Sequence, residues 1–272
     1  MIVTIPVLFL TDTLVLTAYM MAVACIGIFE LLRCIKLNKW YIVIPTEIAA
    51  VASHVICRLS LFGGENLTSK TLMFIYLCIV AVFVFYLFAL SIFLPEKYNI
   101  ETNGFGGLMC TYIVAATVSA VMLCEIPNGK YAFPLLFVAS WMADAFAYLI
   151  GMKLGKHKLC PKISPKKSVE GAIGGIVGCI IGTLVYAFIV SQINRDLKPS
   201  YVALVITAIV LAVISQLGDL VMSLVKRRFG IKDYGKLLPG HGGILDRFDS
   251  VIAVSIFIFV IYTLFEPARG FI

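Results

Sequence analysis

The chain has 272 residues, of which 61% are hydrophobic and 14% charged, and its mean hydropathy is +1.02. This composition excludes a soluble globular domain. The net charge of +7 reflects an excess of lysine and arginine, and the eight cysteines contain no Cys-x-x-Cys pair, so no thiolate metal site is indicated. Five of these cysteines lie singly in apolar runs, where packing is their expected role: Cys25, Cys57, Cys78, Cys110 and Cys179.

Eight apolar runs are long enough to cross a hydrocarbon core of about 30 Å as helices. They cover residues 11–32, 40–62, 71–94, 105–124, 131–152, 171–192, 201–223 and 250–266. The short alternating segments of transmembrane strands are absent from the sequence. The predicted fold class is therefore all-α, a polytopic integral membrane helical bundle. Residues 1–10 are apolar but too short to span alone and lack the features of a signal peptide, so they either extend the first helix or form a short ninth.

Basic residues are concentrated in three connections between these spans. The loops at 153–170 and 226–249 hold twelve of the 22 basic residues, and the loop at 33–39 adds three more. In an eight-span chain these loops share one side, which the positive-inside rule predicts to be cytoplasmic. Both termini then lie on the side opposite the cytoplasm, unless a short extra helix places the N-terminus on the cytoplasmic side.

The sequence suggests one continuous membrane domain with two functional parts. Spans within residues 1–130 are expected to be scaffold, and spans within 131–272 to carry the chemistry, because the long basic loops follow residue 150. The sixth span carries a glycine ladder, which consists of Gly171, Gly174, Gly175, Gly178 and Gly182. Since no P-loop lysine follows and no strand precedes it, we interpret the ladder as a surface for close helix packing.

An ionisable residue inside a span is a functional candidate, because each such charge costs about 2.5–3.5 kcal/mol by insertion scales. Asp144 lies in the middle of the fifth span. Asp219 belongs to a polar stripe at helical spacing, formed by Gln216, Asp219, Ser223 and Lys226 and followed by Arg227 and Arg228. A snorkelling basic helix end is common, but a carboxylate below it on the same face indicates a functional site.

The segment Lys232–Asp249, KDYGKLLPGHGGILDRFD, precedes the last span. Its glycines and proline allow an irregular backbone whose N–H groups can converge on an anion. Asp246 and Asp249 are three residues apart, on one face of the first turn of that span. Aspartates for a hard cation such as Mg²⁺, together with basic residues for phosphate, predict phosphoryl or nucleotidyl transfer. Those basic residues are Lys166, Lys167, Lys226, Arg227, Lys232 and Arg247.

Several motifs together resemble the phosphatidate cytidylyltransferase (CDP-diacylglycerol synthase) family. They are Asp144-x-x-Ala147-Tyr148-x-x-Gly151, Ser164-Pro165-Lys166-Lys167-Ser168-x-Glu170-Gly171, Ser223-x-x-Lys226-Arg227, Lys232-Asp233-x-Gly235 and Pro239-x-His241-Gly242-Gly243-x-x-Asp246-Arg247-x-Asp249. The resemblance is dense over residues 135–260, and the first half adds only a Phe29-Glu30-Leu31-Leu32 run. It implies a reaction of CTP with phosphatidate that gives CDP-diacylglycerol and pyrophosphate with Mg²⁺, in phospholipid biosynthesis.

The resemblance also implies roles for individual residues. Asp219 and Asp246 are expected to be the principal metal ligands, with Asp144 and Asp249 as further ligands or hydrogen-bond partners of the ligands. The residues expected to bind substrate phosphates are Lys166, Lys167, Ser168, Ser223, Lys232 and Arg247. Lys226, Arg227 and His241 are expected to act at the reacting phosphates, with His241 as a hydrogen-bond donor. CTP and phosphatidate are the expected partners, with no nucleic acid, and a homodimer is a family expectation.

Two other functions stay open from the residues alone. A CTP-dependent kinase of a polyprenol or similar lipid alcohol needs the same metal and phosphate chemistry, plus a base for the hydroxyl. A secondary transporter could use Asp144 and Asp219 as coupling sites, although such proteins usually show paired repeats. Glu47, His54 and Arg58 form another polar stripe, in the second span, and we expect it to make an internal contact between spans.

Overall fold

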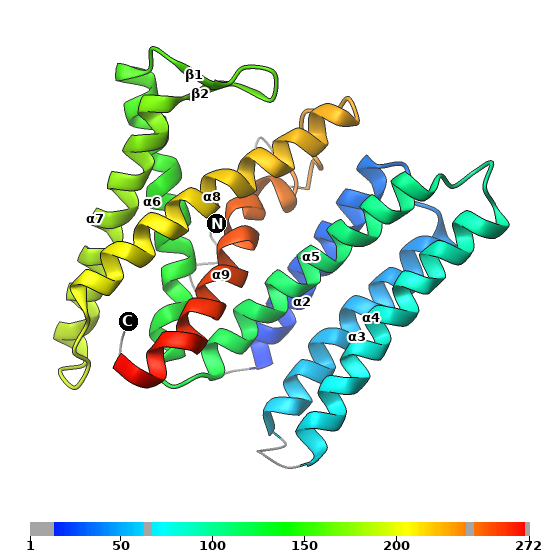
Figure 1. Ribbon diagram of the computed structural model, residues 1–272, viewed down its shortest axis with the longest axis horizontal. Helices are drawn as coiled ribbons and strands as arrows, with labels where there is room; N and C mark the ends of the chain where they lie inside the picture. Colours follow the sequence, from blue (N-terminus) through cyan, green and yellow to red (C-terminus); the bar gives the residue numbers. More distant parts are fainter. Residues whose placement is uncertain (1–13, 63–66, 238–241, 270–272) are drawn as a thin grey trace. The chain divides into compact units, whose positions relative to one another are not determined.

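The computed structural model describes residues 14–62, 67–237 and 242–269, which are mostly helical (Figure 1). The helices are α2 (Leu14–Cys34), α3 (Trp40–Phe62), α4 (Leu67–Phe93), α5 (Ile100–Glu125), α6 (Gly129–Leu154), α7 (Val169–Ile193), α8 (Tyr201–Arg228) and α9 (Leu245–Arg269). Each contains a stretch long and apolar enough to cross a membrane, which confirms the eight predicted spans and the helical membrane fold. Residues 1–10, for which the sequence left open an extension of the first helix or a short ninth one, lie outside the described residues.

The chain divides into two compact units. Among the described residues, the N-terminal unit comprises 14–62, 67–121, 231–237 and 242–247, and the C-terminal unit comprises 122–230 and 248–269. The sequence places the start of the catalytic spans at residue 131, so it does not anticipate that 231–247 joins the N-terminal unit.

In the C-terminal unit, α7 packs along α6 through the glycine ladder, and α8 packs on both helices. A Cβ atom added at Gly174, Gly178 or Gly182 would overlap Ile150, Phe146 or Met142 of α6. A Cβ at Gly175 would lie 2.9 Å from the carbonyl oxygen of Ala143 and 3.1 Å from the side-chain nitrogen of Gln216. The packing interpretation of the ladder is therefore confirmed, and α6 is the facing helix.

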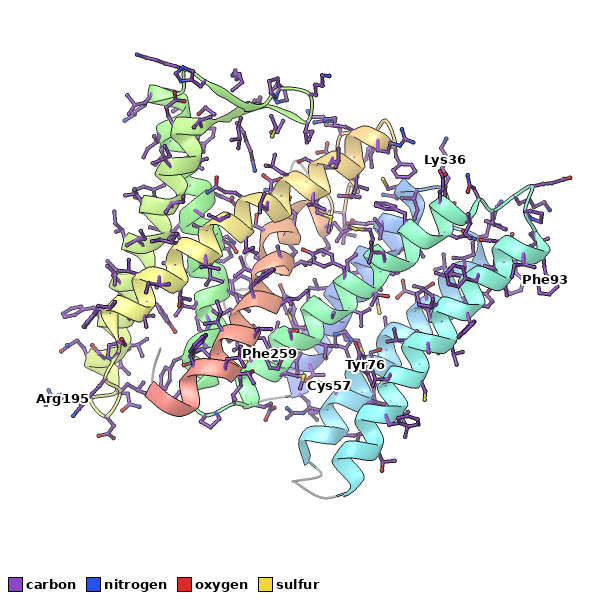
Figure 2. All side chains as sticks on the ribbon, in the orientation of Figure 1. Lys36, Cys57, Tyr76, Phe93, Arg195 and Phe259 are labelled. Atoms are coloured by element: carbon purple, nitrogen blue, oxygen red, sulfur yellow. The ribbon has the colours of Figure 1, made fainter. Side chains whose placement is uncertain are left out.

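A small β-hairpin connects α6 to α7 (Figure 1), so the expectation that no strand precedes the glycine ladder is wrong. Strands β1 (Lys158–Cys160) and β2 (Ser164–Ser168) are antiparallel, with Lys158 opposite Ser168 and Cys160 opposite Ser164. Glu170 closes the hairpin, since its carboxylate accepts the backbone N–H groups of Lys156 and His157 and contacts the His157 ring at 2.6 Å. The hairpin lies at the N-terminal end of α7, and the connection that contains Arg195 lies at its C-terminal end (Figure 2).

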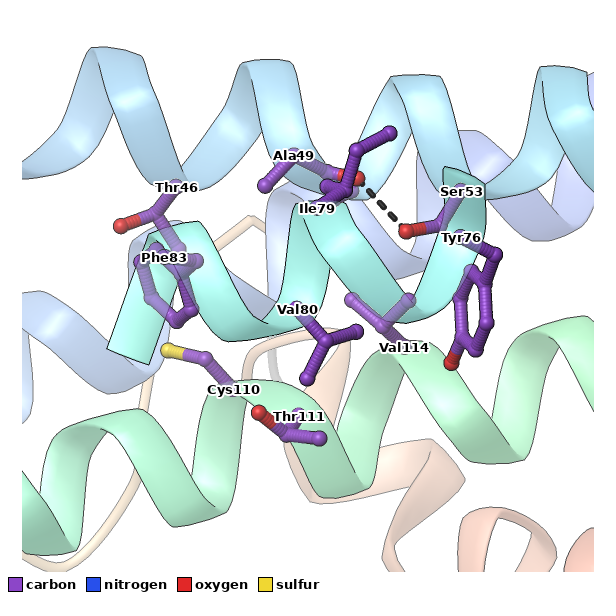
Figure 3. A pocket seen from close by; sticks show the side chains of 11 residues that line it. Thr46, Ala49, Ser53, Tyr76, Ile79, Val80, Phe83, Cys110, Thr111 and Val114 are labelled. Carbon is purple, nitrogen blue, oxygen red and sulfur yellow. Dashed lines mark hydrogen bonds between the residues drawn. The ribbon is translucent and has the colours of Figure 1, made fainter. Parts of the chain in front are cut away.

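In the N-terminal unit, α3 packs on α2 and on α4. In the polar stripe of α3, Glu47 makes the expected contact between spans, because it accepts a hydrogen bond from the Cys25 thiol of α2. The buried His54 ring instead contacts the carbonyl oxygen of Ala50 in its own helix, at 2.9 Å. A cavity of about 20 Å³ between α3, α4 and α5 includes Ser53, Tyr76 and Cys110 in its lining (Figure 3). This volume has room for about one water molecule, so it is too small for a substrate.

Candidate active site

Helices α8 and α9 cross closely at Gly218, within the C-terminal unit. A Cβ atom at Gly218 would overlap the Cβ of Ala253 and lie 3.0 Å from the carbonyl oxygen of Asp249. Small residues on both helices therefore allow the two backbones to approach, as in many helix pairs in lipid. Because Asp219 directly follows Gly218, the crossing brings Asp219 of α8 to Asp249 of α9.

Three aspartates from three helices are linked at this crossing. The carboxyl groups of Asp219 and Asp249 lie within hydrogen-bonding reach of each other. The Ser250 hydroxyl contacts Asp249 Oδ1 at 3.3 Å and Asp144 Oδ2 of α6 at 3.2 Å, so it bridges Asp249 and Asp144. Carboxylates this close repel each other unless a proton or a cation lies between them. The arrangement therefore suits either a shared proton or a bound cation.

Two lysines face these carboxylates. Lys167 of β2 forms an ion pair with Asp219, with its Nζ 2.6 Å from Oδ2. The side chains of both partners are about a quarter exposed, so water reaches the pair (24% and 26%). Lys226, on the same face of α8, is only 8% exposed and attracts both Asp219 and Asp249 electrostatically. Negative groups for a metal and positive groups for phosphate thus occur in one place.

Three further predicted site residues of this unit make local contacts. The Ser223 hydroxyl donates to Asp219 Oδ1 at 3.3 Å, so it helps to orient that carboxylate. Ser168 caps α7, since its hydroxyl accepts the N–H of Gly171 at 3.1 Å. Arg227 donates from Nε to the Ile163 carbonyl oxygen at 3.3 Å, which ties the end of α8 to the hairpin.

Lys166 precedes Lys167 on β2 and is exposed. Adjacent side chains on a strand point to opposite faces, so Lys166 points away from the side on which Lys167 meets Asp219.

The remaining predicted residues belong to the N-terminal unit or are not described. One oxygen of Asp246 accepts the backbone N–H groups of Tyr234 at 2.7 Å and Gly243 at 2.9 Å. Lys232 and Arg247 are exposed, and His241 lies outside the described residues. The hypothesis that Asp246 shares an ion with Asp219 stays a prediction.

The donor set fits a magnesium ion that relies partly on its substrate. Among the described residues, no group of three or more His, Cys, Asp or Glu side chains is arranged to hold one ion. Mg²⁺ in phosphate-transfer sites usually takes one or two carboxylates, several waters and substrate phosphates rather than a protein cage. The adjacent carboxylates Asp219 and Asp249 meet that requirement.

Ser250 is the residue of this site that sequence reasoning missed. It is 3% exposed and joins the carboxylates of Asp144 and Asp249. Its position beside Asp249 in an otherwise apolar helix was the available signal.

A second cavity, of about 300 Å³ between α4 and α5, is lined mainly by apolar residues such as Val84 and Leu87, and none of its lining side chains is titratable.

Comparisons with known proteins identify the family of this chain. The model of the cytidylyltransferase family matches residues 1–265. The phosphatidate cytidylyltransferase of Bacillus subtilis is 33% identical over 267 residues, which cover 92% of this chain and 89% of that protein. Proteins of the same name from Rickettsia bellii and Staphylococcus epidermidis are 35% and 42% identical over shorter matches, which cover 53% and 43% of this chain and 63% and 44% of those proteins. With its aspartates and lysines gathered where three membrane helices meet, the chain belongs to the cytidylyltransferase family.

Proposed function

We propose that this chain transfers CMP from CTP to phosphatidate, which gives CDP-diacylglycerol and pyrophosphate in phospholipid biosynthesis. The observation that carries the proposal is the cluster of Asp144, Asp219 and Asp249 with Lys167 and Lys226, in a chain whose relatives bear that activity in their names. All three aspartates lie in apolar spans, which suits an enzyme whose lipid substrate stays in the bilayer.

The reaction needs positioning and charge neutralisation more than a strong base. A phosphate monoester has a second pKa near 6, so the phosphate of phosphatidate is mostly dianionic at neutral pH. One of its oxygens attacks the α-phosphorus of CTP. The bond from that phosphorus to the oxygen bridging the α- and β-phosphates breaks, and pyrophosphate leaves with the electron pair. Because no proton is removed from the nucleophile, His241 is assigned as a hydrogen-bond donor to phosphate.

The lysines supply the positive charge that this reaction requires. Lys167 and Lys226 already attract the carboxylates electrostatically, and an incoming triphosphate offers them a second set of anionic oxygens. Lys166 and Arg227 provide further charge near the hairpin, and Lys232 and Arg247 provide it from the segment before and at the start of α9. In this proposal Ser223 holds Asp219 in orientation.

In the C-terminal unit Asp219 would hold Mg²⁺ as a principal ligand, with Asp249 and Asp144 as further ligands; the role of Asp246 as the second principal ligand stays a prediction. When bound, the ion offsets the negative charge that develops on the departing pyrophosphate. The carboxylate pair supports this assignment, because its mutual repulsion is relieved by a cation.

The proposed location is the cell membrane, with the site facing the cytoplasm. The lysine-rich hairpin and the basic end of α8 meet at the same place, through Arg227 and Ile163. The positive-inside rule assigns such a region to the cytoplasmic side, where CTP is available.

The test is an assay of purified protein with labelled CTP, phosphatidate and Mg²⁺, in detergent micelles. We expect label in CDP-diacylglycerol, release of pyrophosphate, and loss of both when Mg²⁺ is chelated. Asp219→Asn and Asp249→Asn should each lower kcat by about 10²- to 10³-fold, the scale for removing one group that stabilises transition-state charge. Asp196→Asn, in the exposed connection between α7 and α8, is the matched control and should leave the rate unchanged.

Product analysis separates this function from its main alternative. A lipid kinase would leave a phosphate on the lipid and release CDP rather than pyrophosphate. Absence of CDP-diacylglycerol with the folded wild-type protein would refute the proposed activity. Full activity of both aspartate variants would refute the site.

A further inference from the structure

Glu30 is a buried carboxylate of α2 that the proposed chemistry does not use. Its side chain is 4% exposed. Its oxygens accept two backbone N–H groups at the start of α9, Ile244 at 3.1 Å and Leu245 at 2.9 Å. The first N–H groups of a helix have no partner within the helix, and a negative group there is favoured by the helix dipole. Glu30 thus caps α9 from a helix more than 200 residues earlier in the sequence.

Two more hydrogen bonds fix the other side of the same segment. Arg33, one turn after Glu30, donates from Nη2 to the carbonyl oxygen of Tyr234 at 2.6 Å. The N–H of Tyr234 donates in turn to Asp246 Oδ2 at 2.7 Å, and the Tyr234 side chain is 2% exposed. Residues on both sides of 238–241 are therefore held by α2 and by Asp246.

The glycines of this segment are explained by Glu30. A Cβ atom at Gly235 or at Gly243 would overlap the Glu30 carboxylate. Gly242 has a φ of 84°, a conformation that other residues adopt only with strain. The Glu30 carboxylate occupies the space left by the missing side chains of Gly235 and Gly243, so a substitution at one of these residues should displace the others.

The same contacts revise an expectation from the sequence. The N–H groups around the glycine run were expected to converge on an anion, and a substrate phosphate was the natural candidate. The N–H groups of Gly243, Ile244 and Leu245 instead donate to carboxylates of the protein, those of Asp246 and Glu30. These three N–H groups are therefore already occupied and do not bind a substrate phosphate.

We propose that Glu30 is a positioning residue for the reaction: its bonds to Ile244 and Leu245 set the backbone of residues 242–247 and, with the bonds to Tyr234, that of residues 231–237, and so hold Lys232 and Arg247 in place for substrate phosphate. This inference rests on the proposed function. Glu30 itself touches no substrate. Its effect on the rate comes through the segment that it holds, and a displacement of about 1 Å in such a segment can cost about 10²-fold in rate.

Two measurements on Glu30→Gln test this role. The glutamine side chain keeps the shape but offers one oxygen where the carboxylate offers two, so one of the two N–H groups loses its acceptor. Hydrogen exchange of the peptide covering residues 242–249 should speed up at least about tenfold, since these amides are protected only while bonded. The value of kcat/KM for CTP should fall by about 10- to 100-fold with an unchanged melting temperature in detergent. Glu101→Gln, an exposed glutamate at the start of α5 in the same unit, is the matched control.

A double-mutant cycle supplies a readout that a general loss of stability would not give. Gly235→Ala should lower kcat/KM because its Cβ overlaps the Glu30 carboxylate and also comes within 2.9 Å of the Gly243 Cα. In a Glu30→Asp background the shorter side chain leaves room, so the combined loss should be smaller than the product of the single losses. Gly235→Ala also replaces Glu30→Gln as the test if the latter does not yield folded protein.

The outcomes separate this inference from the proposed function. Faster exchange and lower kcat/KM in Glu30→Gln, with a normal control, support the positioning role. Wild-type exchange or wild-type kinetics in Glu30→Gln overturns it, and so does a strictly multiplicative cycle. If the wild-type protein makes no CDP-diacylglycerol, the proposed function and the role of Glu30 in it fail together, and exchange then reports only whether Glu30 holds the segment.

Discussion

A single methyl group added at Gly218 tests whether the crossing of α8 and α9 sets the active-site geometry. In Gly218→Ala the new Cβ overlaps the Cβ of Ala253 and comes within 3.0 Å of the Asp249 carbonyl oxygen. The two helices must move apart, and Asp219 then moves away from Asp249. Because α9 contributes both Asp249 and Ser250, the whole carboxylate cluster is affected.

The magnitude follows from two opposing effects. Alanine is favoured over glycine in a helix by about 1 kcal/mol, which stabilises the variant. Overpacking at the crossing costs about 1–3 kcal/mol, so the net change in the free energy of unfolding is small. Catalysis is more sensitive, since a shift of about 1 Å between catalytic groups costs about 10²-fold. We expect kcat/KM for CTP to fall by about 30- to 100-fold while the melting temperature changes little.

The assay is transfer of labelled CMP to phosphatidate in mixed micelles, with thermal unfolding followed in the same detergent. Ala253→Gly removes the nearer of the two atoms that the new methyl group meets, so Gly218→Ala/Ala253→Gly should recover part of the lost activity. Gly104→Ala is the control, because nothing lies within 4 Å of a Cβ at that helical position. Full activity of Gly218→Ala, or no recovery in the double variant, would refute the reasoning.

Three other predictions concern the hairpin and the helix packing of the C-terminal unit. Lys167→Gln removes the ion pair with Asp219 and should raise the KM for CTP about tenfold, the effect of one charge-assisted contact. Lys167→Arg keeps the charge and should raise the KM less. Equal KM values for the two variants would contradict the role of the charge. Gly178→Leu forces a side chain into Phe146 of α6 and should lower the free energy of unfolding by about 1–3 kcal/mol or more, seen as a lower melting temperature, and unchanged melting would argue against the packing. Trypsin should cut the β1–β2 hairpin in inside-out membrane vesicles and the connection at Arg195 in right-side-out vesicles, and the reverse pattern would invert the proposed orientation.

Features encoded locally could be predicted from the sequence. The spans follow from runs of apolar residues, because each helix must satisfy its own backbone hydrogen bonds in lipid. Asp144 and Asp219 were predicted as site residues because a carboxylate in a span is costly without a partner. The glycine ladder of α7 predicted close packing for a similar reason, although the sequence did not show that α6 is the helix it faces.

Features that depend on distant contacts could not be predicted. The hairpin at 158–168 has only eight residues in its two strands and lies between helices, so its pattern resembles any polar loop. Glu30 satisfied the same criterion as Asp144, an ionisable residue in an apolar span, but its partners lie more than 200 residues away. Ser250 appeared as an ordinary small residue of the last span.

The sequence by itself determined that the protein crosses the membrane with helices and which residues supply charge, because hydropathy and residue type act over single turns of chain. Only the tertiary structure decided which of those charges meet. Asp219 faces Asp249 because Gly218 lets two helices touch, and Lys167 reaches Asp219 because a hairpin returns to α8. Such pairings depend on the packing of separate spans, and a pattern along one span contains no information about its neighbour.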